Sequence, residues 1–294
     1  MSAERVAVLL EALPYIQRFR GAVVVVKYGG NAMVEPALGR AVADDVVLLR
    51  AVGLKPVVVH GGGPQISDLM ARLGKEVTFR DGLRVTDAET VDIARMVLVG
   101  KVNRDIVSAI NVHGPLAVGL SGEDAGLILA GARNPDLGFV GDVASVNPAI
   151  LHRLLAEDLI PVVSTIGSDA SGQAYNINAD TVAGALAEAL RAEKAIFLTD
   201  VPGLLADVDD PASLVSHTTT GELEAMIAAG RLSGGMVPKL AAALHAVQHG
   251  VASAHLLDGR VPHVLLLELF SDAGVGTMIS AGPAPTRNAA EEAS

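Results

Sequence analysis

The sequence predicts a three-layer α/β/α sandwich around a mainly parallel sheet, preceded by an N-terminal helix. Three observations lead to this prediction. Continuous apolar runs of strand length recur along the 294 residues and alternate with longer stretches of helical periodicity. The first two runs each end in a glycine-rich turn, and strand, turn and helix then follow one another as in a buried parallel sheet. Half of the residues are hydrophobic but only 3% are aromatic, a composition that suits an α/β fold.

The first expected element is a helix within residues 1–20, which we interpret as an oligomerisation or regulatory helix. Pro14 should kink or interrupt it. Apolar side chains recur at helical spacing and form one face, which consists of Val6, Leu9, Leu10, Leu13 and Ile16. Such a face must be buried, either against the body of the same chain or against a partner subunit.

The apolar runs and the periodic stretches give the remaining elements. Strands are expected at 22–26, 55–59, 116–120, 160–163, 195–198 and 254–257. Helices are expected at 37–52, 88–111, 149–157, 180–191, 221–229 and 236–249. Shorter alternating segments at 126–131 and 138–146 predict a hairpin on the edge of the fold. The segment 281–294, rich in Ala, Pro and Glu, is expected to be disordered.

Composition excludes several functions. The chain has 22 basic and 33 acidic residues, a net charge of -11, which argues against a protein that binds nucleic-acid backbones. The absence of cysteine removes disulfides, thiolate zinc sites, iron–sulfur clusters and cysteine nucleophiles, and fits a reducing compartment. The N-terminus lacks the layout of a signal peptide, and the apolar runs are too short to cross a membrane, so a cytoplasmic protein is expected.

Ligands of open parallel sheets gather at the carboxyl ends of the strands. Gly29 and Gly30 follow the first strand, and the glycines 61–63 follow the second, with a helix expected to start near Pro64. Such turns let backbone N–H groups approach an anion, so they indicate an anionic substrate. The motifs of P-loop proteins, dinucleotide-binding folds, serine hydrolases and zinc proteases are missing, and the 8 histidines are scattered. No metal ion held by the protein itself is expected.

Two lysines stand at positions that favour an anion nearby. Lys27 closes the first apolar strand, where an unpaired ammonium would be costly to bury; the alternative is an edge lysine that extends into solvent. Lys239 follows a glycine pair at the start of an expected helix, where the helix dipole disfavours a cation. A polyanion bound at that place would explain the second lysine.

Polar residues at other element ends complete the pattern. In the segment 176–180, Asn178 or Asp180 can cap the next helix, and Asn176 adds a third polar side chain. Asp200 ends another apolar strand, and Arg84 is either a solvated loop residue or a bidentate clamp for a carboxylate. Two lysines, these aspartates and two glycine turns without a P-loop suit phosphoryl transfer, which needs positioning and charge neutralisation.

These segments, in this order, resemble the amino acid kinase family over about residues 8–280. The resemblance is carried by Val26-Lys-Tyr-Gly-Gly-Asn31, His60-Gly-Gly-Gly-Pro64, Gly82-Leu-Arg-Val-Thr86, Asn176-Ile-Asn-Ala-Asp180, Thr199-Asp-Val-Pro-Gly203 and Gly234-Gly-Met-Val-Pro-Lys239. Within the family, the chain resembles most the arginine-inhibited members, which phosphorylate N-acetyl-L-glutamate. It implies transfer of the ATP γ-phosphate to the γ-carboxylate of that substrate, the second step of arginine biosynthesis, with Mg²⁺ bound through the ATP phosphates.

The resemblance also implies roles for individual residues. Lys27 and Lys239 would stabilise the transition state, and Asp180 would orient both lysines. The substrate would be bound by Gly62, Gly63, Arg84 and Asn176, and the ATP phosphates by Gly29, Gly30, Asp200 and Lys239. Residues 21–192 would form the substrate-binding lobe and residues 193–280 the ATP-binding lobe of one fold.

The two ends of the chain resemble those of the arginine-inhibited members. In those members, N-terminal helices interlace between dimers to build a homohexamer, a trimer of dimers, and L-arginine binds beside the helix. The positions implied for L-arginine are Tyr15, Lys194, His263, Glu268 and Gly274.

Three rival functions stay open. One is another kinase of the same fold acting on glutamate, aspartate, carbamate, UMP or a carrier-linked amino acid. Another is a non-catalytic arginine sensor, although the presence of Lys27, Lys239 and Asp180 counts against it. A nicotinamide-dependent dehydrogenase would need a glycine fingerprint that the first strand–turn–helix unit lacks.

Overall fold

The computed structural model describes residues 3–33, 35–80, 82–207, 209–210, 212–230, 232, 235–271 and 274–283. Its main sheet has eight strands, in the order β12 (His217–Thr219), β14 (Thr277–Ser280), β13 (Ser253–Asp258), β11 (Lys194–Thr199), β1 (Val23–Tyr28), β2 (Lys55–His60), β8 (Ile160–Ser164) and β5 (Ala117–Ser121). All neighbours pair in parallel except β13 and β14. The predicted, mainly parallel sheet is confirmed.

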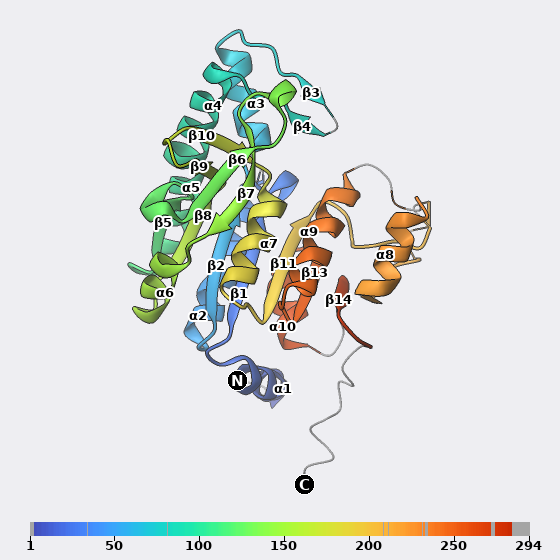
Figure 1. Cartoon of the computed structure of the whole chain (residues 1–294). Helices are drawn as coiled ribbons and strands as arrows, with labels where there is room; N and C mark the ends of the chain where they lie inside the picture. Colours follow the sequence, from blue (N-terminus) through green and yellow to red (C-terminus); the bar gives the residue numbers. More distant parts are fainter. Residues whose placement is uncertain are drawn as a thin grey trace.

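Alternation along β1 shows how the layers form. Val25 points into one buried cluster, and Val24 and Val26 point into another on the opposite face. Helices on the first face are α6 (Ala149–Ala156), α7 (Ala179–Ala189), α8 (Thr220–Ala228) and α9 (Met236–Gln248). Helices on the second face are α2 (Pro36–Ala51), α5 (Asn103–Asn111) and α10 (Val264–Phe270). The three-layer sandwich, visible in Figure 1, is therefore confirmed.

A second group of elements lies beyond the carboxyl end of β2 (Figure 1). Four strands close into a small barrel: β6 (Ile128–Ala132), β7 (Val140–Val146), β9 (Ile166–Ser168) and β10 (Ala174–Ile177). Beside them lie α3 (Gly63–Arg72), α4 (Ala88–Arg95) and the two-stranded pair β3 (Phe79–Arg80) and β4 (Leu83–Arg84). The predicted antiparallel pairing of the segments near 130 and 140 is confirmed, but β9 and β10, which were not predicted, close these strands into a barrel.

The long helix predicted at 88–111 is continuous but not uniform. It consists of α4, a π-helical segment η2 (Met96–Val102) and α5. Short 3₁₀ turns also occur, at η1 (Gly30–Met33), η3 (Asp124–Gly126) and η4 (Pro135–Leu137). A π segment inside an α-helix is rare and is found mostly at functional sites, which directs attention to the residues it contacts.

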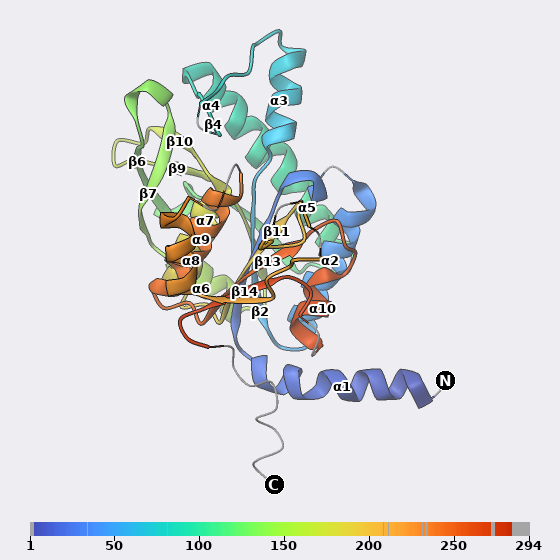
Figure 2. The same ribbon diagram turned by 90° about the vertical axis from the view of Figure 1, so that its right-hand side faces the viewer.

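The N-terminal helix α1 (Ala3–Phe19) runs through Pro14, so the expected interruption there is wrong. Its last residue, Phe19, is buried, and the helix contacts α10, while its N-terminal end projects beyond the body of the molecule (Figure 2). Leu10 and Leu13 are 62% and 43% exposed. No helix in the part of the chain that the structure describes has the length and apolar character needed to cross a membrane.

The remaining strand predictions agree with the structure to within two residues at either end. The disorder predicted for 281–294 falls, from residue 284 onward, outside the described residues and stays a prediction.

Candidate active site

Lys27 and Asp180 form an ion pair at the carboxyl end of the central strand. Lys27 is the penultimate residue of β1 and Asp180 is the second residue of α7, and each residue is 7% exposed. Lys27 Nζ lies 3.0 Å from Asp180 Oδ1. That oxygen accepts no well-directed hydrogen bond, so the contact is mainly coulombic. A buried ammonium held by a single carboxylate keeps further capacity to contact a second anion.

Local chain geometry explains why Asp180 reaches Lys27. The Oδ1 atom of Asn178 accepts hydrogen bonds from the backbone N–H groups of Asp180 (2.8 Å) and Thr181 (3.3 Å). Asn178 is therefore the N-cap of α7, which settles the choice that the sequence left open and leaves the Asp180 carboxylate for Lys27. Strand β10 leads into this cap and places Asn176, half-buried, two residues before it.

Both glycine turns lie against this ion pair. A Cβ atom at Gly29 would lie 3.1 Å from Lys27 Nζ, and one at Gly61 would lie 3.5 Å from the Cβ atom of Ala179. A Cβ atom at Gly62 would come within 2.6 Å of Leu98 Cδ2, in the π segment η2. Gly30, with φ of +71°, has the backbone conformation that favours glycine. The small residues therefore allow the two strand ends and α7 to approach one another.

His60 holds the second glycine turn by a hydrogen bond to its backbone. It is fully buried, and its Nδ1–H donates to Gly61 O (2.9 Å) while its Nε2 accepts from Asn103 Nδ2 (3.1 Å). The Asn103 amide also donates to Val162 O in β8, at 2.8 Å. Burial lowers the pKa of His60 to about 4, so the ring is neutral at neutral pH. The position of His60 at a strand end was visible in the sequence, but nothing there pointed to Asn103.

Arg84 is buried and lies beside the start of α3. Its Nη2 donates to Gly63 O (2.9 Å) and to Ser67 Oγ (2.8 Å), and its guanidinium lies 4.9 Å from the centre of the Phe79 ring. Among the described residues no carboxylate lies within 4.0 Å of it. Burial lowers the pKa of Arg84, yet arginine stays charged at neutral pH. Of the two alternatives for Arg84, the solvated loop residue is therefore excluded, and a cation without a carboxylate partner among the described residues stands at the glycine turn.

The structure does not bring two other predicted residues into contact with Lys27. The Nζ of Lys239 donates to Gly235 O at 3.2 Å, within the first turn of α9, and forms no ion pair with any described residue. Asp200 follows β11, is exposed, and acts electrostatically on Arg260. Both residues belong to the segment 193–280.

Four of the five residues implied for L-arginine line one cavity of about 530 Å³, which is separate from the Lys27 site. They are Tyr15, Lys194, Glu268 and Gly274. His263 does not line it; this residue is the N-cap of α10, and its Nδ1 lies 2.6 Å from Asp45 Oδ1. The chain segments of this cavity come from α1, β11, β13, α10 and β14, far apart in the sequence.

A hydrogen-bonded chain crosses this cavity. Lys194 Nζ donates to His255 Nε2 (2.9 Å), and His255 Nδ1–H donates to Glu268 Oε1 (2.8 Å). Backbone N–H of Val275 donates to Glu268 Oε2 at 3.0 Å. Burial alone would raise the pKa of Glu268, but His255, the Val275 N–H and Lys194 together hold it below its ordinary value. The cavity therefore contains a buried, ionised carboxylate, and His255 is a member that the sequence did not single out.

A comparison with known protein families decides the relationship. The sequence pattern of the amino acid kinase family matches residues 22–258. This chain belongs to the amino acid kinase family. It is accordingly a kinase, and the resemblance of the six sequence segments is confirmed.

Within the amino acid kinase family, the chain is more than half identical to several curated acetylglutamate kinases. The chain is 55% identical to the acetylglutamate kinase of Symbiobacterium thermophilum, with 94% of this chain and 97% of that protein covered. It is 56% identical to the acetylglutamate kinase of Saccharopolyspora erythraea (95% and 93% covered) and 54% identical to that of Nostoc sp. (94% and 94% covered).

Solved structures of other proteins are similar to this chain in fold. The crystal structure of N-acetylglutamate synthase from Neisseria gonorrhoeae, with coenzyme A and N-acetyl-glutamate, matches with a TM-score of 0.83 and 26% identity. It covers 95% of this chain, and this chain spans 64% of that one. Carbamate kinase from Giardia lamblia bound to AMP-PNP matches in fold, with a TM-score of 0.67 and 17% identity over 89% and 99% of the two chains.

In the structure of this amino acid kinase, contacts connect most of the residues that were predicted to bind the substrate or to act on it. Contacts link Arg84 to Gly63, the glycine turn to Ala179, and Asp180 to Lys27. The residues that sequence reasoning missed, His60 and Asn103, lie directly beneath this turn and hold it by buried hydrogen bonds. Only the histidine gave a signal, because it ends an apolar strand.

Proposed function

We propose that this enzyme transfers the γ-phosphoryl group of ATP to the γ-carboxylate of N-acetyl-L-glutamate and forms N-acetyl-L-glutamyl 5-phosphate. The observation that carries the proposal is the buried Lys27–Asp180 ion pair, placed at the carboxyl end of β1 between two glycine turns. The shared name of relatives that are more than half identical over nearly their full length supports the choice of substrate.

The chemistry needs positive charge more than it needs a base. The attacking γ-carboxylate is ionised at neutral pH, so no residue has to remove a proton from it. The difficulty is that two anions must approach each other in a protein of net charge -11. Lys27 supplies a fixed positive charge at that point, and Asp180 holds the ammonium in place so that little reorganisation is needed during the reaction.

Arg84 fits the binding of the non-reacting end of the substrate. Its buried guanidinium has no protein carboxylate within ion-pair distance among the described residues, and it is held by Gly63 O and Ser67 Oγ. A substrate α-carboxylate at this place would provide the missing counter-ion through a bidentate contact. Gly62, Gly63 and Asn176 would complete this side, on the lobe of residues 21–192.

ATP would enter from the elements of residues 193–280, with Gly29 and Gly30 near its phosphates. Lys239 stands in the first turn of α9 and would turn from Gly235 O toward the transferred group when ATP is bound. Asp200 would lie on the ATP side. Mg²⁺ would neutralise phosphate charge, and it would arrive with ATP because Asp180 is already engaged with Lys27.

Feedback inhibition by L-arginine is a further part of the proposal. The cavity lined by Tyr15, Lys194, Glu268 and Gly274 offers an ionised carboxylate to a guanidinium, and α1 forms one of its walls. His263, by contrast, is engaged with Asp45 outside the cavity. We also propose that α1 assembles the chain into a homohexamer, since Leu10 and Leu13 are exposed in the single chain.

The decisive experiment measures ADP release from Mg-ATP with N-acetyl-L-glutamate, L-glutamate or L-aspartate, each with and without L-arginine. We expect turnover only with the acetylated substrate and suppression by L-arginine. Turnover with an unacetylated substrate instead would replace the proposed acceptor. Absence of turnover combined with saturable L-arginine binding would favour the arginine sensor. Turnover that L-arginine leaves unchanged at every substrate concentration would remove the regulatory part alone.

A further inference from the structure

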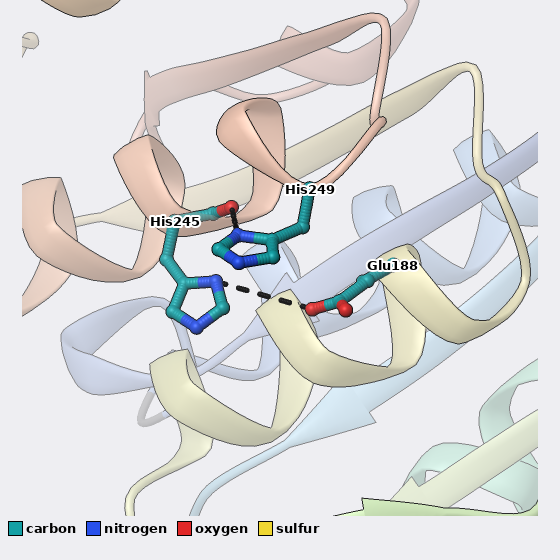
Figure 3. Close-up of side chains that lie close together, drawn as sticks. All are labelled: Glu188, His245 and His249. Carbon is teal, nitrogen blue, oxygen red and sulfur yellow. Dashed lines mark hydrogen bonds and ion pairs between the residues drawn. The ribbon is translucent and has the colours of Figure 1, made fainter.

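Three side chains with the chemistry of metal ligands meet at the ends of α7 and α9. They are Glu188, in the last turn of α7, and His245 and His249, at the end of α9. One ligand atom from each can be chosen such that all three lie within 4.8 Å of one another. Figure 3 shows the two imidazoles one above the other on α9, with the Glu188 carboxylate reaching toward His245 from α7.

The packing of the two helices fixes this meeting point. A Cβ atom at Gly184 would lie 3.2 Å from the carbonyl oxygen of Ala242 and 3.9 Å from the Cβ atom of Ala246. The glycine therefore lets α7 and α9 run in close contact, as Figure 1 shows. One turn further along, Glu188 faces His245, and the two histidines are four positions apart in the sequence, the spacing that places both on one side of a helix.

Hydrogen bonding leaves the nitrogen atoms suited to coordination. His249 Nδ1 lies 2.8 Å from His245 O, and because a carbonyl can only accept, Nδ1 carries the proton. The lone pair of His249 is then on Nε2, and this backbone contact is the kind that orients histidine ligands in metal sites. His245 Nδ1 lies 3.9 Å from Glu188 Oε2, too far for a hydrogen bond, and no other described residue bonds this ring.

We propose that Glu188, His245 and His249 bind a borderline transition-metal ion, with Zn²⁺ as the representative ion. Two imidazoles and a carboxylate form a donor set that zinc accepts, with water as the fourth ligand, whereas Mg²⁺ prefers oxygen donors alone. Tetrahedral zinc places its ligand atoms about 3.4 Å apart. At the widest separation the ligand atoms must therefore approach one another by about 1.4 Å. The side chains of His245 and Glu188, 62% and 40% exposed, have room to do so.

This ion would be distinct from the magnesium that accompanies ATP. It revises the expectation from the sequence that no metal is held by the protein itself, which looked only for the motifs of metalloenzymes. The site would also connect the two proposed lobes, because Asp180 lies in the first turn of α7 and Lys239 in the first turn of α9. That consequence depends on the proposed function, but the binding of zinc does not.

The chain is well suited to a direct test, since it contains no cysteine to compete for zinc. Of the other six histidines, five are engaged elsewhere: His60, His113, His217, His255 and His263. The sixth, His152 on α6, is exposed and is not one of the three clustered side chains, so His152→Ala is the matched control.

Zinc binding would be measured by competition with a zinc-sensitive dye, in excess Mg²⁺ and without substrates, using the purified full chain. Wild type and His152→Ala should each bind one Zn²⁺ per chain. The His245→Ala/His249→Ala variant should lose affinity by more than the roughly 10- to 100-fold that the loss of a supporting partner costs. Added zinc should raise the melting temperature of wild type but not of the double variant.

Equal zinc affinity of the wild type and the double variant would overturn the proposal, and so would a wild type that takes up no zinc. Circular dichroism of both proteins verifies that the exposed substitutions leave the fold intact. Because no ATP or N-acetyl-L-glutamate is present, a failure here leaves the proposed kinase reaction untouched, and a failed kinase assay leaves the zinc site untouched.

Discussion

At the scale of single residues, the site depends on a few charges that have little contact with solvent. Lys27 and Asp180 pair at 3.0 Å with side chains that are 8% and 10% exposed. Removal of one partner from such a pair leaves an uncompensated buried charge, which is costly. The pair therefore links stability to the proposed chemistry, and substitutions there must be analysed for both.

Lys27→Met should reduce kcat by about 100- to 1,000-fold, because one preorganised positive charge at the transferred phosphoryl group is lost. The KM for N-acetyl-L-glutamate should change much less. Steady-state kinetics would be compared with those of Lys101→Met, which removes an exposed lysine whose ion pair in the described part of the chain is with Asp105, four positions along the same helical stretch. A Lys27→Met enzyme with kcat within about twofold of wild type would remove Lys27 from the mechanism.

Gly62→Ala should disturb the second glycine turn, because the new Cβ atom would lie 2.6 Å from Leu98 Cδ2. We expect a loss of about 1–3 kcal/mol in the free energy of unfolding, typical of overpacking, together with weaker substrate binding. Gly63→Ala is the control, since among the described residues no atom outside its chain neighbours and its own helical turn lies within 4 Å of the Cβ atom it would add. Denaturant unfolding distinguishes the two, and equal stability of both variants would contradict the close approach.

Glu268→Gln should abolish inhibition by L-arginine while leaving the uninhibited kcat nearly unchanged. The substitution removes the buried negative charge of the cavity and retains its shape. Glu157→Gln, at the exposed end of α6, is the control. The inhibition curve of each enzyme at fixed substrate concentrations is the measurement. Unaltered inhibition of Glu268→Gln would exclude this cavity as the arginine site.

At the scale of elements, the helix α1 stands out, because it contributes little to the core of its own chain. Of its described side chains only Phe19 is buried, while Leu10 and Leu13 are exposed. Exposed leucines on a projecting helix fit a surface that another subunit would cover in the proposed hexamer. The sequence left this choice open, and the exposure of these two side chains favours a partner subunit.

Leu10→Glu/Leu13→Glu should therefore lower the molar mass in solution from that of a hexamer to that of a smaller species. Light scattering coupled to size-exclusion chromatography gives the molar mass directly. Leu73→Glu, at the end of α3, introduces the same charge at another leucine that is 58% exposed. If wild type and the double variant have the same mass, α1 does not assemble the enzyme.

Much of the element order could be predicted from the sequence, for a simple physical reason. Strands of a buried parallel sheet are continuous apolar runs, so β1, β2, β8 and β11 are recognisable without their neighbours. The strands β9, β10, β12 and β14 are three or four residues long and are defined by partners distant in sequence, so no local pattern predicts them.

The site was predictable to a similar extent. Lys27, Asp180 and the glycine turns stand at element ends, where a parallel sheet collects its ligands, and this rule is enough to predict them. The roles of Arg84 and Asn103 depend on burial and on contacts across the fold, which no sequence window contains. The π segment η2 likewise leaves no trace, because helical periodicity continues on both sides of the inserted turn.

At the scale of the whole molecule, pH acts on stability through buried groups. The unfolded chain protonates His60 near pH 6.5, whereas the folded chain does so only near pH 4. As pH falls between these values the unfolded state binds more protons, so the stabilising contribution is complete above pH 6.5 and decreases toward pH 4. Asp45 acts in the opposite direction in this range, because burial raises its pKa to about 6.

We therefore expect His60→Gln to lose less stability on acidification than wild type does. Between pH 7 and pH 5 the difference should be about 2 kcal/mol in the free energy of unfolding. Urea unfolding of both proteins at the two pH values gives this difference directly, and it cancels the contribution of Asp45, which both chains share. Identical pH dependence of the two proteins would show that His60 is not kept neutral by burial.

The central position of β1 in the sheet has a consequence for the synthesis of the protein on the ribosome. β1 is synthesised before the other strands of its sheet, and β2, which pairs with one of its edges, follows soon afterwards. The other edge pairs with β11, which does not exist until Lys194–Thr199 has been made. During most of translation, a row of valines therefore presents an open hydrogen-bonding edge to the solvent. The nascent chain is therefore most prone to aggregate while this strand edge is unpaired, which is well before its active site is complete.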